Sequence, residues 1–236
     1  HELGKVCDST KNLLDKLREK AIEVNKLWAY KLSIPVSTAI TCVKPSGTVS
    51  QLTDSASGIH PRYSEYYIRT VRGDKSDPLT GFLITEGVPC EDAVSDPTGN
   101  TAVFSFPTKS PIKARKRSSI TAIEHLEIWK MYQEHWCEHK PSITINVKDG
   151  EWLDVGAWVY KNFDICSGIS FLPYSDHIYA QAPYQEVSKG DYNKALALMP
   201  TNFDLTRLSE FESGDTTVGN QTLACTADSC EVVDIT

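Results

Sequence analysis

The sequence predicts an α/β fold. Strand-like apolar runs alternate with helix-like segments along most of the chain, and this alternation favours parallel strands joined by helical crossovers. The 236 residues are 40% hydrophobic and 23% charged, which is ordinary for a globular protein with a sizeable core. No run of eighteen apolar residues occurs in the sequence, so we expect no membrane partner.

The chain opens with a long helical pattern. Ser9 is the expected N-cap of a helix from about Lys11 to Lys31. The apolar residues of this segment recur at helical spacing and share one broad face. They are Leu13, Leu14, Leu17, Ala21, Val24, Leu27 and Trp28.

Strands and helices then alternate. Ala39–Val43 has the pattern of a buried strand, and a short helix is expected after residue 45 until about Ser57, where Gly58-Ile-His-Pro61 ends it. The later expected elements are, in order, a strand at Tyr66–Val71, a helix at Pro78–Gly87, a strand at Thr101–Phe106, a helix at Thr121–Glu138, a strand at Ser142–Val147, a helix at Glu151–Lys161 and a strand at Ile169–Leu172.

The net charge of −7 argues against a surface that coats nucleic acid, so no nucleic-acid partner is expected. One basic cluster, Lys113, Arg115, Lys116 and Arg117, lies among Ser and Pro and predicts a solvated loop. The first residues, 1–5, contain neither an initiator Met nor a signal-peptide pattern. We therefore expect a piece that begins inside a longer protein.

Cysteine usage indicates a reducing, cytoplasmic environment. The chain has seven Cys, an odd and scattered set that does not resemble a small secreted disulfide framework. Cys42 lies in an apolar run and is expected to be a buried small hydrophobe.

Two histidines have the spacing of metal ligands on a helix. His135 and His139 are four residues apart, but Cys137 between them would point to another side of the helix. We favour a helix end before Pro141 and assign no metal ligand.

The C-terminal tail has its own character. After Arg207 there is no Lys or Arg, and Ser, Thr, Gly and acids dominate residues 209–222, which predicts a flexible linker. Cys225 and Cys230 follow, five residues apart, a spacing that closes a small disulfide ring. The alternatives are a zinc half-site or an inert pair of thiols. The functional hypothesis is a swinging dithiol that carries electrons by thiol–disulfide exchange.

A Pro-Ser-Gly-Thr turn follows the Ala39–Val43 run. Here backbone N–H groups and small hydroxyls gather where a helix begins, and such a place favours anions. The candidate phosphate-binding residues are Ser46, Gly47, Thr48, Val49 and Ser50. Gly47 allows a ligand to approach the backbone closely. The alternative is an ordinary strand-to-helix turn.

Longer motifs carry a family resemblance. Lys44-Pro-Ser-Gly-Thr-Val-Ser50, Ser57-Gly-Ile-His-Pro-Arg62 and Tyr66-Tyr-Ile-Arg-Thr-Val-Arg72 resemble the substrate-phosphate loop region of ribonucleotide reductases. The resemblance is to the adenosylcobalamin-dependent class II ribonucleoside-triphosphate reductases, and it extends from about residue 20 to the end. Further matching motifs are Val103-Phe-Ser-Phe-Pro107, Gln133-Glu-His-Trp-Cys-Glu-His-Lys-Pro-Ser-Ile-Thr144, Trp158-Val-Tyr160 and Phe171-Leu-Pro-Tyr-Ser-Asp-His177.

The resemblance implies the fold and the activity. It implies the C-terminal half of a ten-stranded α/β barrel over residues 1–208 and a redox-active cysteine tail over residues 209–236. It also implies reduction of ribonucleoside triphosphates to 2′-deoxyribonucleoside triphosphates by a thiyl radical, with adenosylcobalamin as cofactor. Cys225 and Cys230 would then re-reduce an active-site cysteine pair and be reset by thioredoxin or a similar dithiol.

The resemblance also implies what this chain does not contain. The family's radical cysteine lies on a finger loop that would precede His1, so the fragment should be inactive without the missing N-terminal part of the same enzyme. Asp176-His177 lacks the remainder of a cobalt-ligating motif. A class I large subunit would carry a tyrosine pair near Tyr174, and a class III enzyme would end in a glycyl-radical motif. Two alternatives stay open: a class I-type subunit, and a non-catalytic nucleotide-binding module with a redox-sensing dithiol.

Overall fold

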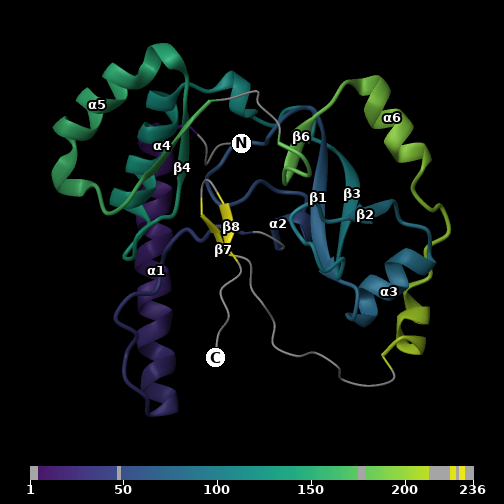
Figure 1. The fold of residues 1–236 in the computed structure, drawn as a ribbon. Coiled ribbons are helices and arrows are strands. Elements are labelled where there is room, and N and C mark those ends of the chain that lie inside the picture. Colours follow the sequence, from purple (N-terminus) through teal and green to yellow (C-terminus); the bar gives the residue numbers. More distant parts are fainter. Residues whose placement is uncertain (1–4, 47–48, 175–178, 213–223, 227–228, 232–236) are drawn as a thin grey trace. The chain divides into compact units, whose positions relative to one another are not determined.

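The computed structural model describes residues 5–46, 49–174, 179–212, 224–226 and 229–231 (Figure 1). The chain divides into two compact units. The first contains His1–Arg62 and Lys113–Ser175, and the second contains Tyr63–Ile112 and Asp176–Thr236.

The first unit is built on helices and one parallel strand pair. Strand β4 pairs in parallel with β5, and helix α5 connects them, so the predicted β-α-β crossover is confirmed here. Helices α1 and α4 pack together, and α4 also packs against β4 and α5 (Figure 1). The bounds are α1 Asp8–Leu32, α2 Val49–Leu52, η1 Arg117–Ser119, α4 Ala122–His135, β4 Thr144–Val147, η2 Asp149–Glu151, α5 Trp152–Lys161, η3 Phe163–Ile165 and β5 Ser170–Pro173.

Helix α4 illustrates how the sequence fixes an element. The Thr121 hydroxyl accepts a hydrogen bond from the Glu124 N–H at 3.1 Å, and the Glu124 carboxylate accepts one from the Thr121 N–H at 2.9 Å. This capping box starts the helix where the sequence predicts it. Its buried face supplies Leu126 and Trp129 to the core of the unit. The other buried members of that core are Ala122, Ile143, Ile145, Val147, Val155 and Trp158.

The second unit has an antiparallel sheet with the strand order β2-β3-β1-β6. The expectation of parallel pairing is wrong for this sheet, because only a short connection separates β2 from β3, and such neighbours pair antiparallel. Helix α6 packs against β3 and β1. The bounds are β1 Tyr66–Asp74, α3 Pro78–Thr85, β2 Cys90–Asp92, β3 Thr101–Lys109, β6 Tyr184–Glu186, α6 Lys189–Ala197 and η4 Leu205–Glu210.

Two short strands lie in the tail. Strand β7 (Ala224–Thr226) pairs antiparallel with β8 (Ser229–Glu231). Neither these strands nor the η4 helix was predicted from the sequence. The η4 helix continues past residue 209, the expected start of the linker. Residues 213–222 of that linker lie outside the described residues.

Several local predictions need correction. Cys7, not Ser9, occupies the N-cap position of α1. The 39–43 segment forms no strand, and its carbonyls accept hydrogen bonds from the segment after α4 instead: Thr41 O accepts from Glu138 N at 2.8 Å. Helix α2 ends at Leu52 rather than near residue 57, since Asp54 adopts a positive φ of 46°. Cys42 is half-buried.

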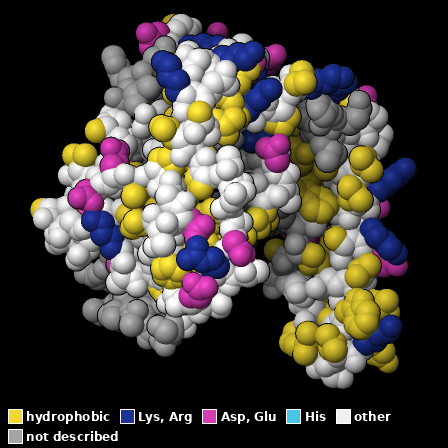
Figure 2. All heavy atoms as spheres, turned by 90° about the vertical axis from the view of Figure 1, so that its right-hand side faces the viewer, with side chains coloured by type: hydrophobic (Ala, Val, Ile, Leu, Met, Phe, Trp, Pro, Cys, Tyr) yellow, Lys and Arg dark blue, Asp and Glu magenta, His cyan; other side chains and the backbone are white. Residues whose placement is uncertain are grey.

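The surface carries mixed charge. On the face drawn in Figure 2, Lys and Arg side chains alternate with Asp and Glu rather than forming one basic field. None of the helices in the described part of the chain is long and apolar enough to span a membrane. One basic residue departs from the prediction of a solvated loop, because Arg117 is buried.

Candidate functional site

The loop before α2 is closed by serine side chains. The Ser57 hydroxyl accepts a hydrogen bond from the Ser46 N–H at 2.8 Å. The Ser46 hydroxyl accepts one from the Ser50 N–H at 2.8 Å, and the Ser50 hydroxyl donates to the Ser46 carbonyl at 2.8 Å. Of the five predicted phosphate-binding residues, Ser46 and Ser50 are therefore joined by hydrogen bonds, and Val49 is the first residue of α2. The other two, Gly47 and Thr48, lie outside the described residues.

Gly58 brings the returning chain against this loop. Its φ of +54° belongs to the left-handed region, which favours glycine. A Cβ atom at this position would lie 3.1 Å from the Lys44 carbonyl oxygen and 3.1 Å from Val43 Cγ1. Only glycine fits this contact without a shift of the loop, so Gly58 holds the Lys44–Ser46 backbone in place.

His60 connects the same segment to the parallel strands. Its Nε2 accepts a hydrogen bond from the Thr144 N–H at 2.9 Å, at the first residue of β4. The proton is then on Nδ1, which donates to the Ser57 carbonyl at 2.7 Å. Burial lowers the pKa of His60 below 6.5, so the ring is neutral near pH 7. His60 is thus a structural link between the loop and β4.

A second buried histidine supports the segment from α4. The ring of His125 contacts His60 edge to face, with centroids 5.9 Å apart. Its Nε2 donates to the Ile59 carbonyl at 3.0 Å. Burial lowers the pKa of His125 to about 4, so it too is neutral at pH 7. Each ring hydrogen-bonds to a backbone carbonyl, His60 to that of Ser57 and His125 to that of Ile59. Neither ring is therefore suited to proton transfer.

Arg62 ends the motif in a buried position with 6% of its surface exposed. Its guanidinium donates to the Asp54 carbonyl and to Asp54 Oδ1, the latter at 2.7 Å. Its backbone makes two further hydrogen bonds: the N–H donates to Arg115 O at 2.8 Å, and the carbonyl accepts from Arg117 N at 2.9 Å. Arg62 therefore connects the end of α2 to the segment before α4.

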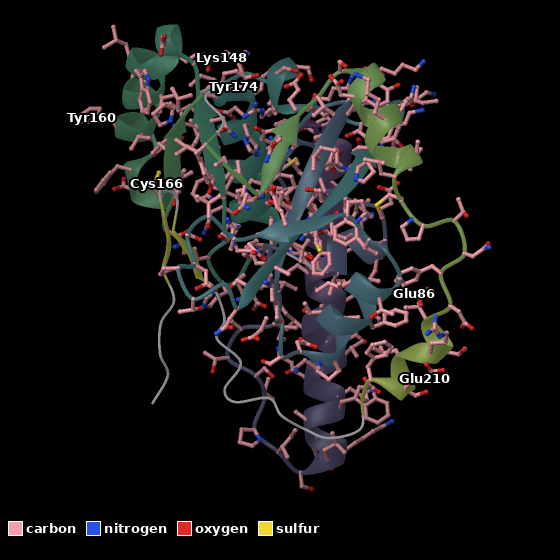
Figure 3. The ribbon with its side chains drawn as sticks, turned by 45° about the vertical axis from the view of Figure 1, so that its right-hand side comes forward. Glu86, Lys148, Tyr160, Cys166, Tyr174 and Glu210 are labelled. Carbon is pink, nitrogen blue, oxygen red and sulfur yellow. The ribbon has the colours of Figure 1, made fainter. Side chains whose placement is uncertain are left out.

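An aromatic residue flanked by cations lies at the carboxyl ends of β4 and β5. The Arg117 guanidinium lies 4.9 Å from the centroid of the Tyr174 ring, and Lys148 Nζ lies 5.7 Å from it (Figure 3). Ligands of α/β sheets bind at these ends. The sequence analysis did not select this cluster, although a tyrosine and a lysine directly after two strand patterns are a usable signal.

His135 contacts a carboxylate of α1 in the structure. Helix α4 ends at His135, so His139 does not continue its face. His135 Nδ1 lies 2.9 Å from Asp15 Oδ2 of α1. Burial raises the pKa of the Cys137 thiol to about 11, so the thiolate that a metal requires is disfavoured. Within the described ranges, no three His, Cys, Asp or Glu residues gather as metal ligands do.

The two tail cysteines occupy partner positions. In the β7–β8 register Cys225 lies opposite Cys230. Directly opposed residues of antiparallel strands have Cα atoms about 4.5–5.5 Å apart, within the range of about 4.4–6.8 Å found for disulfides. Among the other described cysteines, Cys42, Cys90, Cys137 and Cys166 carry free thiols.

Known proteins resemble the chain over most of its length. The probable adenosylcobalamin-dependent ribonucleoside-triphosphate reductase of Dictyostelium discoideum is 35% identical over 219 residues, or 90% of this chain and 27% of that protein. The adenosylcobalamin-dependent ribonucleoside-triphosphate reductase of Euglena gracilis is 31% identical over 202 residues, or 84% of this chain and 27% of that protein. The chain is similar over most of its length to the adenosylcobalamin-dependent, class II ribonucleotide reductases.

A solved structure agrees with this assignment. The crystal structure of a B12-dependent (class II) ribonucleotide reductase matches with a TM-score of 0.71 and 25% identity, over 88% of this chain and 29% of that one. The predicted family and the mixed α/β fold are thereby confirmed, while the ten-stranded barrel and the boundary at residue 208 stay predictions. No protein-family model matches the chain. It spans about a quarter of the length of the curated reductases.

Replacing Gly58 tests the loop geometry. Gly58→Ala should lower the free energy of unfolding by about 1–2 kcal/mol, because the new side chain is strained at positive φ and meets the Lys44 carbonyl. Gly156→Ala in α5 is the matched control. A Cβ there meets no atom within 4 Å, so it should raise the stability by up to about 1 kcal/mol. Urea titration measures both, and a Gly58→Ala protein as stable as wild type would contradict the contact.

The buried histidines predict acid sensitivity. Between pH 6.5 and about 4, His125 is protonated in the unfolded chain but neutral in the folded chain. The free energy of unfolding should therefore fall as the pH falls through this window. The loss from His125 should be about 3 kcal/mol, and His60 should add to it in the same direction. His125→Gln should remove most of the part of this pH dependence that comes from His125. Urea titrations at several pH values measure the slope, and equal slopes in variant and wild type would refute the assignment.

Proposed function

We propose that this chain is part of an adenosylcobalamin-dependent enzyme that reduces ribonucleoside triphosphates to 2′-deoxyribonucleoside triphosphates. The observation that carries the proposal is the 35% identity to a probable reductase of that name over 90% of this chain. Because the chain spans only about a quarter of those proteins, we propose that the radical cysteine and the allosteric region belong to the rest of the enzyme.

The loop of residues 46–50 is proposed to hold the substrate's phosphates. A nucleotide whose ribose undergoes radical chemistry must be held by several fixed donors, since misplacement would divert the radical. Ser46 and Ser50 bind one another and place hydroxyl groups beside the first N–H groups of α2. Gly58 packs against the Lys44 carbonyl, and the Ser46 and Ser50 N–H groups are held by the Ser57 and Ser46 hydroxyls, whose place as acceptors a phosphate would take. A backbone held in place in this way lowers the entropic cost of binding.

The two tail cysteines are proposed to carry the electrons. Reduction of one ribonucleotide to its deoxynucleotide and water oxidises a pair of active-site thiols to a disulfide. The thiols of Cys225 and Cys230 would exchange with that disulfide, so that two electrons and two protons pass to the active site and a Cys225–Cys230 disulfide forms. Thioredoxin or a similar dithiol would then reduce the tail. The opposed backbone positions of the two residues support this ring closure.

Adenosylcobalamin, when bound, supplies the radical that starts the reaction. We assign no cofactor contact to this chain, because its described residues offer no cluster that could ligate a metal and the Asp176-His177 pair lies outside them. The roles proposed for this chain are therefore substrate binding and electron delivery.

The phosphate loop is tested by two substitutions in the full-length enzyme. Ser46→Ala and Thr48→Ala should each raise KM for the ribonucleoside triphosphate, with a cost of about 1–3 kcal/mol for a lost charge-assisted hydrogen bond. Thr85→Ala is the matched control, because its exposed hydroxyl donates to the Gly81 carbonyl within α3, away from the loop in the sequence. Unchanged KM in both loop variants would remove the loop from the substrate site.

The dithiol is tested by the choice of reductant. A Cys225→Ser/Cys230→Ser double variant should lose turnover with thioredoxin but keep it with a small dithiol that reaches the active site directly. Cys90→Ser is the control, since Cys90 is an exposed free thiol. Steady-state deoxynucleotide formation measures this, and equal loss with both reductants would rule out the shuttle.

A further inference from the structure

The segment before the tail is packed firmly onto α3. Phe82 of α3 is fully buried, and both Phe203 and Phe211 contact its ring edge to face, with centroids 5.2 Å and 5.6 Å away. Phe211 also covers Gly81, where a Cβ atom would lie 3.8 Å from Phe211 Cδ1. These aromatic contacts hold both ends of η4 against one helix.

An ion pair adds to this packing. Arg207 of η4 binds Glu86, whose side chain is only 8% exposed, and it also lies 3.5 Å from Glu210 (Figure 3). Glu86 is the C-cap residue of α3, where the helix dipole presents negative charge. A carboxylate in that position, largely removed from water, requires a nearby cation. Arg207 therefore supplies the cation that the Glu86 carboxylate requires.

The helix between these contacts is itself capped. Asp204 Oδ1 accepts hydrogen bonds from the Thr206 N–H at 3.0 Å and from the Thr206 hydroxyl at 2.6 Å. On the N-terminal side, Met199 packs against the core formed by Val88, Ala102 and Phe104. The chain is thus fixed to the second unit from Met199 through Phe211.

The position of this fixed segment sets the length of the tether to the cysteines. Cys225 lies fourteen positions after Phe211 in the sequence, a distance of at most about 50 Å for an extended chain. If η4 detached, the last anchored residue would be Met199, and the tether would lengthen to twenty-six residues. The effective concentration of a tethered group falls roughly as the −3/2 power of tether length, which gives a decrease of about 2.5-fold.

We propose that residues Phe203–Phe211, bound to α3 through Phe82 and Glu86, are the anchor of the redox arm and fix the tether by which Cys225 and Cys230 reach the oxidised active-site pair. The proposal rests on the shuttle function proposed above. Arg207, Phe203 and Phe211 are positioning residues in this scheme, since none of them touches substrate or takes part in thiol exchange.

Single-turnover chemistry of the full-length enzyme separates the arm from the active site. Enzyme reduced beforehand and mixed with substrate without external reductant should form a first deoxynucleotide from its active-site thiols. A second should follow from the tail thiols after exchange. In a Phe203→Ala/Arg207→Ala/Phe211→Ala variant, which removes all three contacts of the anchor, the first equivalent should form at the wild-type rate and the second about 2.5-fold more slowly. Hydrogen exchange at residues 203–211 should rise, which verifies release of the anchor.

Two further variants complete the test. Lys194→Ala removes an exposed lysine of α6 that pairs with Asp191, and it should change neither rate. Insertion of twelve Gly/Ser residues after Glu212 keeps the anchor but gives a twenty-six-residue tether, and it should slow the second equivalent by the same factor. An unchanged second rate in both the released and the lengthened variant would overturn the anchor proposal. A second equivalent that persists in the Cys225→Ser/Cys230→Ser variant would instead overturn the shuttle itself.

Discussion

The hydrogen bond from the Thr144 N–H to His60 Nε2 couples the loop of residues 46–50 to the parallel strand pair. It requires a neutral imidazole with its proton on Nδ1, and burial supplies that state by lowering the pKa of His60. The same segment places Gly58 against Lys44 and the Ser57 hydroxyl against the Ser46 N–H. One short stretch, residues 57–60, therefore fixes the loop, the start of β4 and the packing of His125 together.

This arrangement supports the proposed binding of phosphate by the loop of residues 46–50. The backbone is held from one side by residues 57–60, and a phosphate would replace the Ser57 and Ser46 hydroxyls as acceptors for the Ser46 and Ser50 N–H groups. Electron delivery has the opposite requirement, because one pair of thiols must visit both the active site and an external reductant. A fixed anchor at Phe203–Phe211 followed by a tether of defined length meets that requirement, and each unit of the chain thus supports one of the two proposed tasks.

The parts of the fold that the sequence predicted are those determined by local interactions. Helix α4 was predictable from the Thr121–Glu124 capping box and an apolar stripe, and β4 and β5 from short apolar runs around an amphipathic helix. Strands β2 and β6 have three residues each, too few for a local periodic pattern, and β6 is defined by its distant partner β1. The structural roles of the buried His60 and Arg62 could not be predicted either, because the hydrogen-bond partners of a polar side chain depend on the tertiary fold. The spacing of Cys225 and Cys230 in the sequence was enough to suggest a dithiol. The proposed anchor could not be suggested in this way, because it depends on contacts between α3 and η4.

The central claim is that this chain belongs to an enzyme that reduces ribonucleoside triphosphates with adenosylcobalamin. The most direct measurement is deoxynucleotide formation by the full-length protein that contains the chain, with and without adenosylcobalamin, with thioredoxin as reductant. The account predicts turnover that depends strictly on the cofactor. Turnover without adenosylcobalamin, or no turnover in its presence, would contradict it.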